Sequence, residues 1–459
     1  MPEVRHGVRG RGDAGGGDSG AGSFLTATVV GGGLAGCEAA WALAERGVRV
    51  TLLEMRPVAG TPAHRTDLLA ELVCSNSFKS VETANAHGLL KAELRLLGSL
   101  LLRCADEARV PGGAALAVDR VVFARRVTEL VAGHPNVRVV REEATDLPAC
   151  GVVATGPLTS DALVGAIARR LGRDALSFYD AIAPIVAADS LDRGRLFAAS
   201  RYGKGEGDDY LNAPLSEEDY GAFVAALVSA DRYQAHAFDG VPYFEGCLPV
   251  EEMAARGRES LRFGPMKPVG LRDPASGRMP HAVVQLRRED RAGQMWNLVG
   301  FQTRLRTGEQ QRVFRTIPGL GAAEFLRYGS IHRNSYVNTP ACLGPHLALR
   351  DAPAVLFAGQ LTGIEGYTES LGTGLLAGLN LARIQRGLEP LVPPPETMLG
   401  ALYAYLGAAD PGAFQPMNAN FGLLPPLGDP PRDRAKKKAL LVERALAAMR
   451  GFAERIGAA

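Results

Sequence analysis

The chain has 459 residues, more than one hydrophobic core usually serves, so we expect two domains. Hydrophobic residues make up 46% and charged residues 22%, which is ordinary for a soluble globular enzyme. No apolar run approaches the roughly 20 residues of a bilayer-spanning helix, which excludes a membrane span. Basic and acidic side chains nearly balance, 51 against 49, so a polyanion would have to bind a local basic patch.

The six cysteines are scattered along the chain and form neither a CxxC pair nor a cluster with histidines. This spacing argues against a disulfide framework and against zinc, and we expect no metal site. It indicates a reducing compartment, so a cytoplasmic protein is expected. The cysteines are Cys37, Cys74, Cys104, Cys150, Cys247 and Cys342.

Residues 1–22 are rich in glycine, arginine and aspartate and lack the apolar region of a signal peptide. They are predicted to be a disordered tail or the result of a misassigned start. We therefore expect the folded part of the chain to begin at residue 23.

The segment from Thr28 to Glu54 has the pattern of a βαβ dinucleotide-binding unit. A β-branched run, an Ala-rich helical stretch and an alternating apolar run follow one another, and a GxGxxG motif joins the first two. Its glycines allow a tight turn, backbone approach to a pyrophosphate, and close packing of helix on strand. Glu54 follows Gly36 by 18 residues, where an acid accepts from a ribose 2′-hydroxyl and disfavours NADP. The predicted cofactor residues of this unit are Gly31, Gly32, Gly33, Leu34, Ala35, Gly36 and Glu54.

Two further apolar runs indicate FAD rather than NAD. The run 150–154 predicts a buried strand that ends in a turn at Gly156. The run 354–358 predicts a late strand that leads into a Gly-rich helix over Thr368–Ala382, and this piece can support the ribityl and isoalloxazine portions of FAD. A buried strand with a glycine loop and no ligand stays the alternative. Gly156, Gly359, Gln360, Gly372 and Thr373 complete the predicted cofactor residues.

The predicted fold is α/β: a Rossmann-type FAD-binding domain, discontinuous in sequence, with a smaller α/β domain inserted into it. The predicted parts are 23–162 for the first piece of the FAD-binding domain, 163–321 for the inserted substrate domain, and 322–459 for the second piece with a C-terminal helix. Apolar residues at helical spacing also predict one helix over Leu89–Cys104, covering the site.

Two cysteines lie in a polar context. Cys74 stands in the loop CSNSFK, and Cys247 stands in YFEGCLP, a turn bounded by glycine and proline. A thiol is more often a small buried hydrophobe, so both readings stay open for these two. The apolar surroundings of Cys37, Cys104 and Cys150 predict a structural role, whereas Cys342 stays unassigned.

Several long strings carry a family resemblance: GGGLAGCEAAWALAERGVRVTLLEMRP, TPAHRTDLLAELVCSNSFKS, YFEGCLPVEEMAARGRESLRFGPMKPVGL, GSIHRNSYVNTP and FAGQLTGIEGYTESLGTGLLAGLNLA. From Val29 to about Phe452 the chain resembles the bacterial folate- and FAD-dependent tRNA uracil-5-methyltransferases. These are smaller relatives of the tRNA wobble-uridine modification flavoproteins.

The resemblance implies formation of 5-methyluridine in the T loop of tRNA. The carbon would come from methylenetetrahydrofolate and the reducing equivalents from NAD(P)H through FAD, with no metal and no S-adenosylmethionine. Carbon 5 of uracil is a poor nucleophile until a thiolate adds at carbon 6, so a cysteine is required. The resemblance points to two cysteines, which match Cys74 and Cys247, and leaves their division of roles open. We expect Cys247 to be the nucleophile because it lies in the inserted domain that faces the substrate, and Cys74 to lie beside the flavin, where it would assist proton removal or protect the flavin. It also implies that His332 stacks on the pterin of folate.

The T loop must be opened to expose its uracil, and basic side chains would hold its phosphates. The candidates are Arg262, Lys267, Arg287 and Arg288, for which a solvated face is the alternative. No obligate protein partner is expected. The competing functions are a wobble-uridine enzyme, which needs a longer C-terminal region, an NAD(P)H-dependent flavin oxidoreductase without RNA, and a tRNA chaperone with structural FAD.

Overall fold

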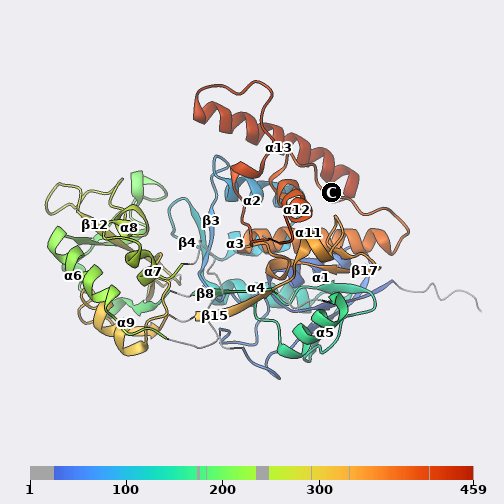
Figure 1. Ribbon diagram of the computed structural model, residues 1–459, viewed down its shortest axis with the longest axis horizontal. Coiled ribbons are helices and arrows are strands. Elements are labelled where there is room, and N and C mark those ends of the chain that lie inside the picture. The colour runs from blue at the N-terminus through green and yellow to red at the C-terminus, as the bar shows by residue number, and fades with distance from the viewer. Residues whose placement is uncertain are drawn as a thin grey trace, which may run out of the picture.

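The computed structural model describes residues 25–61, 63–172, 176–181, 183–233, 248–290, 292–329, 331–412 and 414–457. Its larger sheet has six strands in the order β16-β17-β7-β1-β2-β6, and all neighbours are parallel except β16 and β17 (Figure 1). Strands from both ends of the chain therefore share one sheet, with Val355 opposite Gly151. The strands are β1 (Thr26–Val30), β2 (Arg49–Glu54), β6 (Val137–Arg141), β7 (Gly151–Val153), β16 (Ala348–Leu349) and β17 (Ala352–Phe357).

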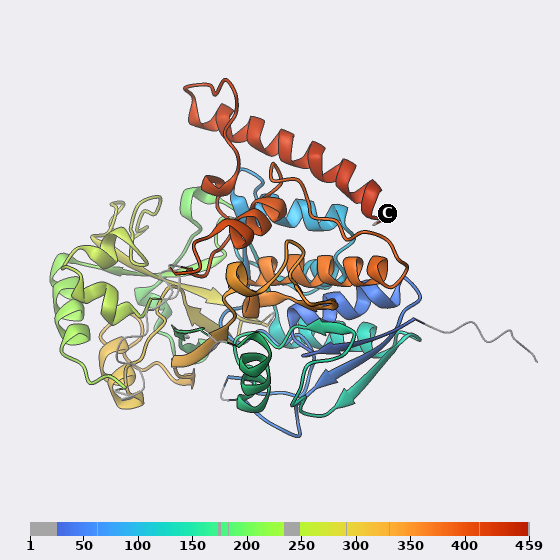
Figure 2. The ribbon, with the colours of Figure 1, turned by 45° about the vertical axis from the view of Figure 1, so that its right-hand side comes forward.

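Two helices from distant parts of the sequence pack closely on this sheet. A Cβ atom at Gly374 would lie 2.2 Å from the carbonyl oxygen of Ala35, and one at Gly378 would lie 2.6 Å from that of Ala39. These glycines bring α11 (Tyr367–Ile384) against α1 (Leu34–Ala44), and Figure 2 shows the two helices running side by side. The other helices around this sheet are α2 (Ala86–Leu96), α3 (Leu100–Glu107), α4 (Arg120–Ala132), α5 (Asp161–Leu171), α12 (Met398–Ala408) and α13 (Arg434–Ile456).

The second sheet has six antiparallel strands in the order β10-β11-β12-β13-β9-β14 and its own apolar core. Aromatic rings fill that core, with Phe301 between Phe223 and Phe314. The strands are β9 (Ile185–Ala187), β10 (Phe197–Ala198), β11 (Tyr210–Leu215), β12 (Ala282–Arg288), β13 (Met295–Leu298) and β14 (Phe325–Arg327). The helices beside it are α6 (Glu217–Val228), α7 (Val250–Ala255), α8 (Ser260–Phe263) and α9 (Thr307–Phe314).

Small sheets lie between the two large ones. The first pairs β8 (Leu176–Ala181) with β15 (Ile331–Tyr336), and the second joins β3 (Ser77–Ser80), β5 (Ala115–Val118) and β4 (Arg109–Val110). Short helical turns complete the description: η1 (Ala188–Ser190), η2 (Arg193–Arg195), η3 (Arg201–Gly203), α10 (Thr339–Cys342), η5 (Gly359–Thr362) and η6 (Phe421–Leu423).

The structure confirms the α/β fold class with a Rossmann-type parallel sheet. The domain boundaries stay a prediction, and α5 bears on them: its Leu163 and Ile167, just past the predicted boundary, belong to the core of the parallel sheet. Residues 1–22 lie outside the described residues. No helix within the described ranges is long and apolar enough to cross a membrane.

The single helix predicted over Leu89–Cys104 is wrong, because the structure has α2 and α3 there. Gly98, at φ +79°, lies in the break, and Ser99 caps the N-terminus of α3. Buried Glu38 stabilises this start by accepting hydrogen bonds from the backbone N–H groups of Leu100 (3.3 Å) and Leu101 (2.9 Å). The segment is therefore divided by a tertiary contact to the unpaired N–H groups at the start of α3. Apolar periodicity along the sequence does not show such a contact.

Candidate functional site

In the glycine loop between β1 and α1, neighbouring backbone segments come too close for most side chains. A Cβ atom at Gly36 would lie 1.8 Å from the carbonyl oxygen of Gly31, and one at Gly31, where φ is +102°, would lie 2.6 Å from that of Ala154. At Gly33 the same atom would meet nothing within 4 Å. Gly31 and Gly36 thus allow the turn and the helix packing, whereas Gly33 borders open space at the N-terminus of α1. Such a helix start is suited to a pyrophosphate.

Glu54, at the end of β2, is tied to this loop. Its Oε2 accepts from the backbone N–H of Gly32 at 2.9 Å, and its Oε1 accepts from the backbone N–H (3.0 Å) and Nε (2.9 Å) of Arg56. Burial alone would raise the pKa of this carboxyl, but the hydrogen bonds from Arg56 hold it below its usual value. A carboxylate has about four acceptor positions, so Glu54 keeps capacity for a ribose hydroxyl.

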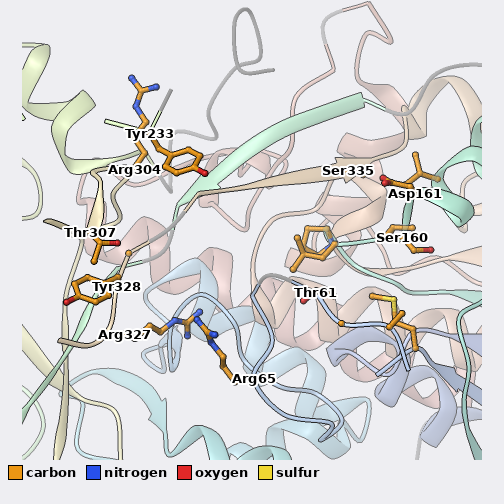
Figure 3. A pocket seen from close by; sticks show the side chains of 18 of the residues that line it. Thr61, Arg65, Ser160, Asp161, Tyr233, Arg304, Thr307, Arg327, Tyr328 and Ser335 are labelled. Atoms are coloured by element: carbon orange, nitrogen blue, oxygen red, sulfur yellow. The ribbon is translucent and has the colours of Figure 1, made fainter. Parts of the chain in front are cut away.

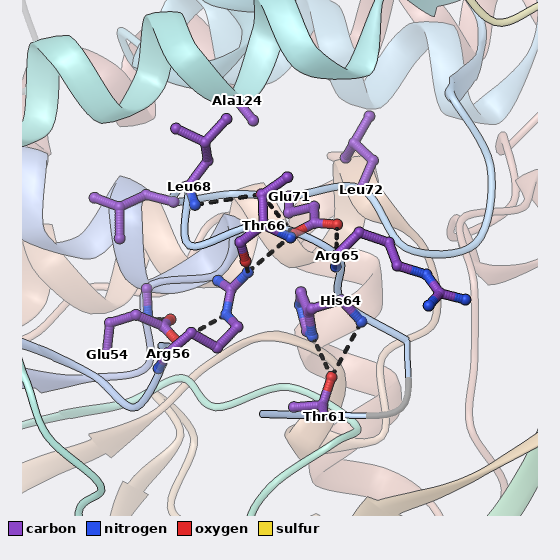
Figure 4. A network of polar contacts seen from close by, with 12 residues as sticks. Glu54, Arg56, Thr61, His64, Arg65, Thr66, Leu68, Glu71, Leu72 and Ala124 are labelled. Atoms are coloured by element: carbon purple, nitrogen blue, oxygen red, sulfur yellow. Dashed lines mark hydrogen bonds and ion pairs between the residues drawn. The ribbon is translucent and has the colours of Figure 1, made fainter. Parts of the chain in front are cut away.

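Arg56 is a residue that the sequence reasoning missed. Its Nη1 donates to Glu71 Oε2 and to the carbonyl of Thr66, both at 3.1 Å, so one buried guanidinium joins Glu54 to the following loop (Figure 4). Glu71 in turn accepts from the backbone N–H groups of Arg65 (2.8 Å) and Thr66 (3.0 Å). The sequence signal was available in the Glu54-x-Arg56 spacing beside a predicted ribose ligand.

Two cavities adjoin this network. The smaller, about 70 Å³, is lined by the glycine loop, Glu54, His64 and Thr155. The larger, about 1110 Å³, lies between loops of the parallel sheet and residues of the second sheet (Figure 3). Both are lined by Met55, Glu143, Leu158, Thr159 and Ser160. The open loop, the acid and the adjoining space fit an extended dinucleotide such as FAD.

The segment that follows β17, the late strand of the parallel sheet, lies beside the glycine loop. After β17, a Cβ atom at Gly359, where φ is +75°, would lie 2.9 Å from the Cβ of Ala35, and the N–H of Gly359 donates to Thr373 Oγ1 at 2.8 Å. Gln360 Nε2 donates to Glu365 Oε1 at 2.6 Å. The structure therefore brings Gly359 and Thr373 beside the N-terminus of α1. Gly372 faces the side chains of α2 and α12 instead, so helix packing accounts for this glycine.

The backbone of the Cys74 loop is held on both sides. The N–H groups of Cys74 and Ser75 both donate to the hydroxyl of Tyr367, at 2.9 and 3.1 Å. Arg120 donates to the carbonyls of Leu72 (2.9 Å) and Cys74 (3.4 Å), and Arg327 donates to that of Val73 at 2.7 Å. Tyr367 opens α11 directly after the late glycine segment. The partly exposed Cys74 thiol is thus carried by a fixed backbone next to the predicted flavin site.

The same loop connects the two large sheets. Arg120 of α4 forms a buried ion pair with Glu289, just after β12, in which Nε lies 2.7 Å from Oε2. Burial alone would lower the pKa of Arg120, but Glu289 raises it. Asn76 donates to the carbonyl of Arg288 at 2.7 Å and accepts from Arg287 Nε at 2.9 Å. These contacts join positions far apart in the sequence, so the residue pattern held no signal for them.

The structure places the predicted RNA-contacting residues in different surroundings. Lys267 is exposed, and Arg262 donates to the carbonyl of His281 at 2.8 Å. The guanidinium of Arg288 lies 5.6 Å from the ring centre of Trp296. Arg287 is only 7% exposed, so its burial argues against a direct phosphate contact.

The remaining predictions concern cysteines and a histidine. Cys247 lies outside the described residues, and for His332 the structure gives the backbone, in β15 opposite Asp180. Burial raises the pKa of Cys37 far above its ordinary value and that of Cys104 to about 12, as suits structural thiols.

Curated relatives match almost the whole chain. A methylenetetrahydrofolate--tRNA-(uracil-5-)-methyltransferase TrmFO of Geobacter sulfurreducens is 60% identical over 425 residues, covering 92% of this chain and 97% of that one. One from Desulforudis audaxviator is 57% identical over 421 residues, covering 91% and 96%. The chain belongs to the TrmFO family.

The TrmFO family resemblance extends to a wider group. The model of the family "Glucose inhibited division protein A" matches residues 26–389. The form I crystal structure of Aquifex aeolicus GidA superposes with a TM-score of 0.70 at 17% identity, covering 95% of this chain and 76% of that one. At this identity the likeness shows the fold alone.

Proposed function

We propose that this chain, a methyltransferase of the TrmFO family, methylates carbon 5 of a uridine in tRNA with methylenetetrahydrofolate as the carbon donor. The observation that carries the proposal is the 60% identity, over 92% of the chain, to a relative with that name. The geometry supports it. The glycine loop between Gly31 and Gly36, Glu54, and the Gly359 segment, together called the dinucleotide cradle, meet the Cys74 loop at the N-terminal part of α11. The finer parts of the proposal are the T loop as the position of the uridine and NAD(P)H as the reductant.

FAD is the cofactor that the cradle accommodates. The glycine loop would face its pyrophosphate, Glu54 its adenosine ribose, and Gly359 and Gln360 its ribityl side. When bound, FAD supplies the electrons that reduce a methylene group to a methyl group. The protein's part is to hold it: the N–H of Gly32 keeps the Glu54 carboxylate oriented, and Arg56 keeps it ionised.

In this proposal Cys247 and Cys74 have different roles in the reaction at uracil. Addition of the Cys247 thiolate at carbon 6 makes carbon 5 nucleophilic, and its departure after methylation restores the ring. Cys74 is proposed to act beside the flavin, as a base toward the carbon 5 proton or as a shield for the activated cofactor. Its fixed backbone supports either role, because a reacting group must be held in position. His332 is proposed to stack on the pterin ring.

The uridine must leave its loop to reach these groups. Lys267, Arg262 and Arg288 of the second sheet and its neighbours are proposed to hold the tRNA backbone, which makes binding salt-dependent. Arg287 is not retained, because it is buried against Asn76.

One assay tests the proposal. The purified protein is incubated with tRNA lacking T-loop methylation, labelled methylenetetrahydrofolate and NADPH, and label is sought in 5-methyluridine. A Cys247→Ala variant should keep its flavin and lose the product, while Cys342→Ala, a matched control at another thiol, should keep both. NADPH oxidation without labelled product from the flavin-containing wild type would instead support a flavin oxidoreductase.

A further inference from the structure

Four arginines line the larger cavity, Arg65, Arg304, Arg306 and Arg327, and two of them, Arg65 and Arg327, face one another. Arg65 comes from the loop after β2, and Arg327 ends β14 of the second sheet. Figure 3 shows their guanidinium ends converging at one edge of the cavity, although the two side chains come from different parts of the chain. Asp161 lies on the far side of the same view. Two positive charges thus meet where the two parts of the fold face each other.

Neither guanidinium has a carboxylate partner within the part of the chain that the structure describes. The hydrogen bond of Arg327 goes to the neutral carbonyl of Val73, at 2.7 Å. Arg56 and Arg120 are different, because each is paired with at least one buried glutamate. Burial and the nearby charges of Arg120 and Arg65 lower the pKa of Arg327. The fold therefore keeps two like charges together without internal compensation, which an anionic ligand would supply.

The position of this pair restricts the ligand. Arg327 contacts Val73, which directly precedes Cys74, and the cavity adjoins the dinucleotide cradle. A molecule whose reacting end lies at the cradle could therefore place a distal oxyanion between the two guanidiniums. Guanidiniums bind carboxylate and phosphate through paired, charge-assisted hydrogen bonds.

We infer that Arg65 and Arg327 form a binding site for the distal oxyanion of a co-substrate that reacts at the cradle. This inference rests on the proposed function, which names two such co-substrates. The oxyanion is either a glutamate carboxylate of methylenetetrahydrofolate or the diphosphate of NAD(P)H. Both present negatively charged oxygens that accept hydrogen bonds from guanidinium groups, so the site chemistry is common to the two sources.

Truncated ligands test the site against matched variants. Calorimetry measures the dissociation constants of tetrahydrofolate and of 6-methyltetrahydropterin, which has no carboxylate, for the flavin-containing wild type, Arg65→Gln and Arg327→Gln. A second arm compares the rates of flavin reduction by NADPH and by 1-benzyl-1,4-dihydronicotinamide, which has no phosphate. Arg278→Gln is the control, because Arg278 is exposed and outside the cavity lining.

In one arm the wild type should favour the complete ligand over the truncated one, and each variant should reduce that preference about tenfold or more. A change in the folate arm identifies the carboxylate, and a change in the nicotinamide arm identifies the diphosphate. The inference would be overturned if, in both arms, the preference for the complete over the truncated ligand were the same in the wild type, the control and Arg65→Gln. Arg65 is exposed, so its variant is expected to fold. Because neither arm uses tRNA or product formation, failure of the methylation assay is a separate result.

Discussion

The dinucleotide cradle and the Cys74 loop are built in opposite ways. Within the cradle, the glycine loop and Glu54 come from one stretch of 27 residues, Thr28–Glu54, and Glu54 bonds to Gly32 only 22 positions away. The Cys74 loop depends on Tyr367, 293 positions away, and on Arg120 with its partner Glu289, 169 positions apart. The glycine loop with Glu54 is local, whereas the contacts of Tyr367 and Arg120 that hold the Cys74 loop, here called the clamp, are tertiary, so substitutions should affect the two differently.

The largest effect is expected from Gly36→Val in the cradle. Its Cβ would lie 1.8 Å from the carbonyl oxygen of Gly31, a backbone atom that cannot move away without opening the turn. We expect loss of roughly 4 kcal/mol or more of folding free energy and a colourless protein, measured by thermal unfolding and flavin absorbance. Gly33→Ala is the matched comparison: its Cβ meets no protein atom, so stability should persist while flavin affinity falls. Equal loss of stability in both would contradict this account.

Arg120→Met breaks the clamp. It leaves the Glu289 carboxylate, whose side chain is 2% exposed, without its cation and removes the donor to Leu72. We expect about 3–5 kcal/mol of destabilisation in urea unfolding. The control is Arg170→Met, which breaks an exposed pair with Asp351 and should cost about 0–1 kcal/mol. A variant of Arg120 as stable as the control would mean that the two sheets are held by other contacts.

His64 makes the cradle sensitive to acid. Burial, followed by the charge of Arg56, lowers its pKa to about 4, below the usual 6.5. The native state therefore binds fewer protons than the unfolded state between these values, so stability is retained above pH 6.5 and falls as the pH drops toward 4. Between pH 7 and 4.5 the free energy of unfolding should fall by about 1–3 kcal/mol less in His64→Gln than in the wild type. Urea unfolding at the two pH values measures this difference. His134→Gln is the control, and the wild-type pH dependence in His64→Gln would refute the assignment.

Tyr367→Phe should destabilise the fold less than Arg120→Met and should act mainly on the Cys74 loop. It removes the acceptor shared by the N–H groups of Cys74 and Ser75, at a cost of about 1–3 kcal/mol. The loosened loop should make the Cys74 thiol alkylate several times faster, as measured by mass spectrometry of the labelled peptide. Tyr405→Phe is the matched control, because its hydroxyl bonds to Gln415 away from the loop. An unchanged alkylation rate would show that the arginines alone hold the loop.

The helical segment after the Cys74 loop shows where periodicity stopped being informative. Apolar spacing predicted one helix over Leu89–Cys104, because amphipathic spacing continues across the break. The structure ends α2 at Leu96 and starts α3 at Leu100, with Glu38 of α1 accepting from the new helix start. A buried carboxylate from another helix decided the break.

The sequence by itself determined the glycine loop, the acid that follows it and the family. Glycine positions, the acid after the second strand and the long family strings are local patterns, and local backbone requirements can be read from local residues. Only the tertiary structure decided that Arg56 orients Glu54, that Arg287 is buried, and that Tyr367, Arg120 and Arg327 hold the Cys74 loop. These depend on which distant side chains burial brings together, and no spacing along the chain records that.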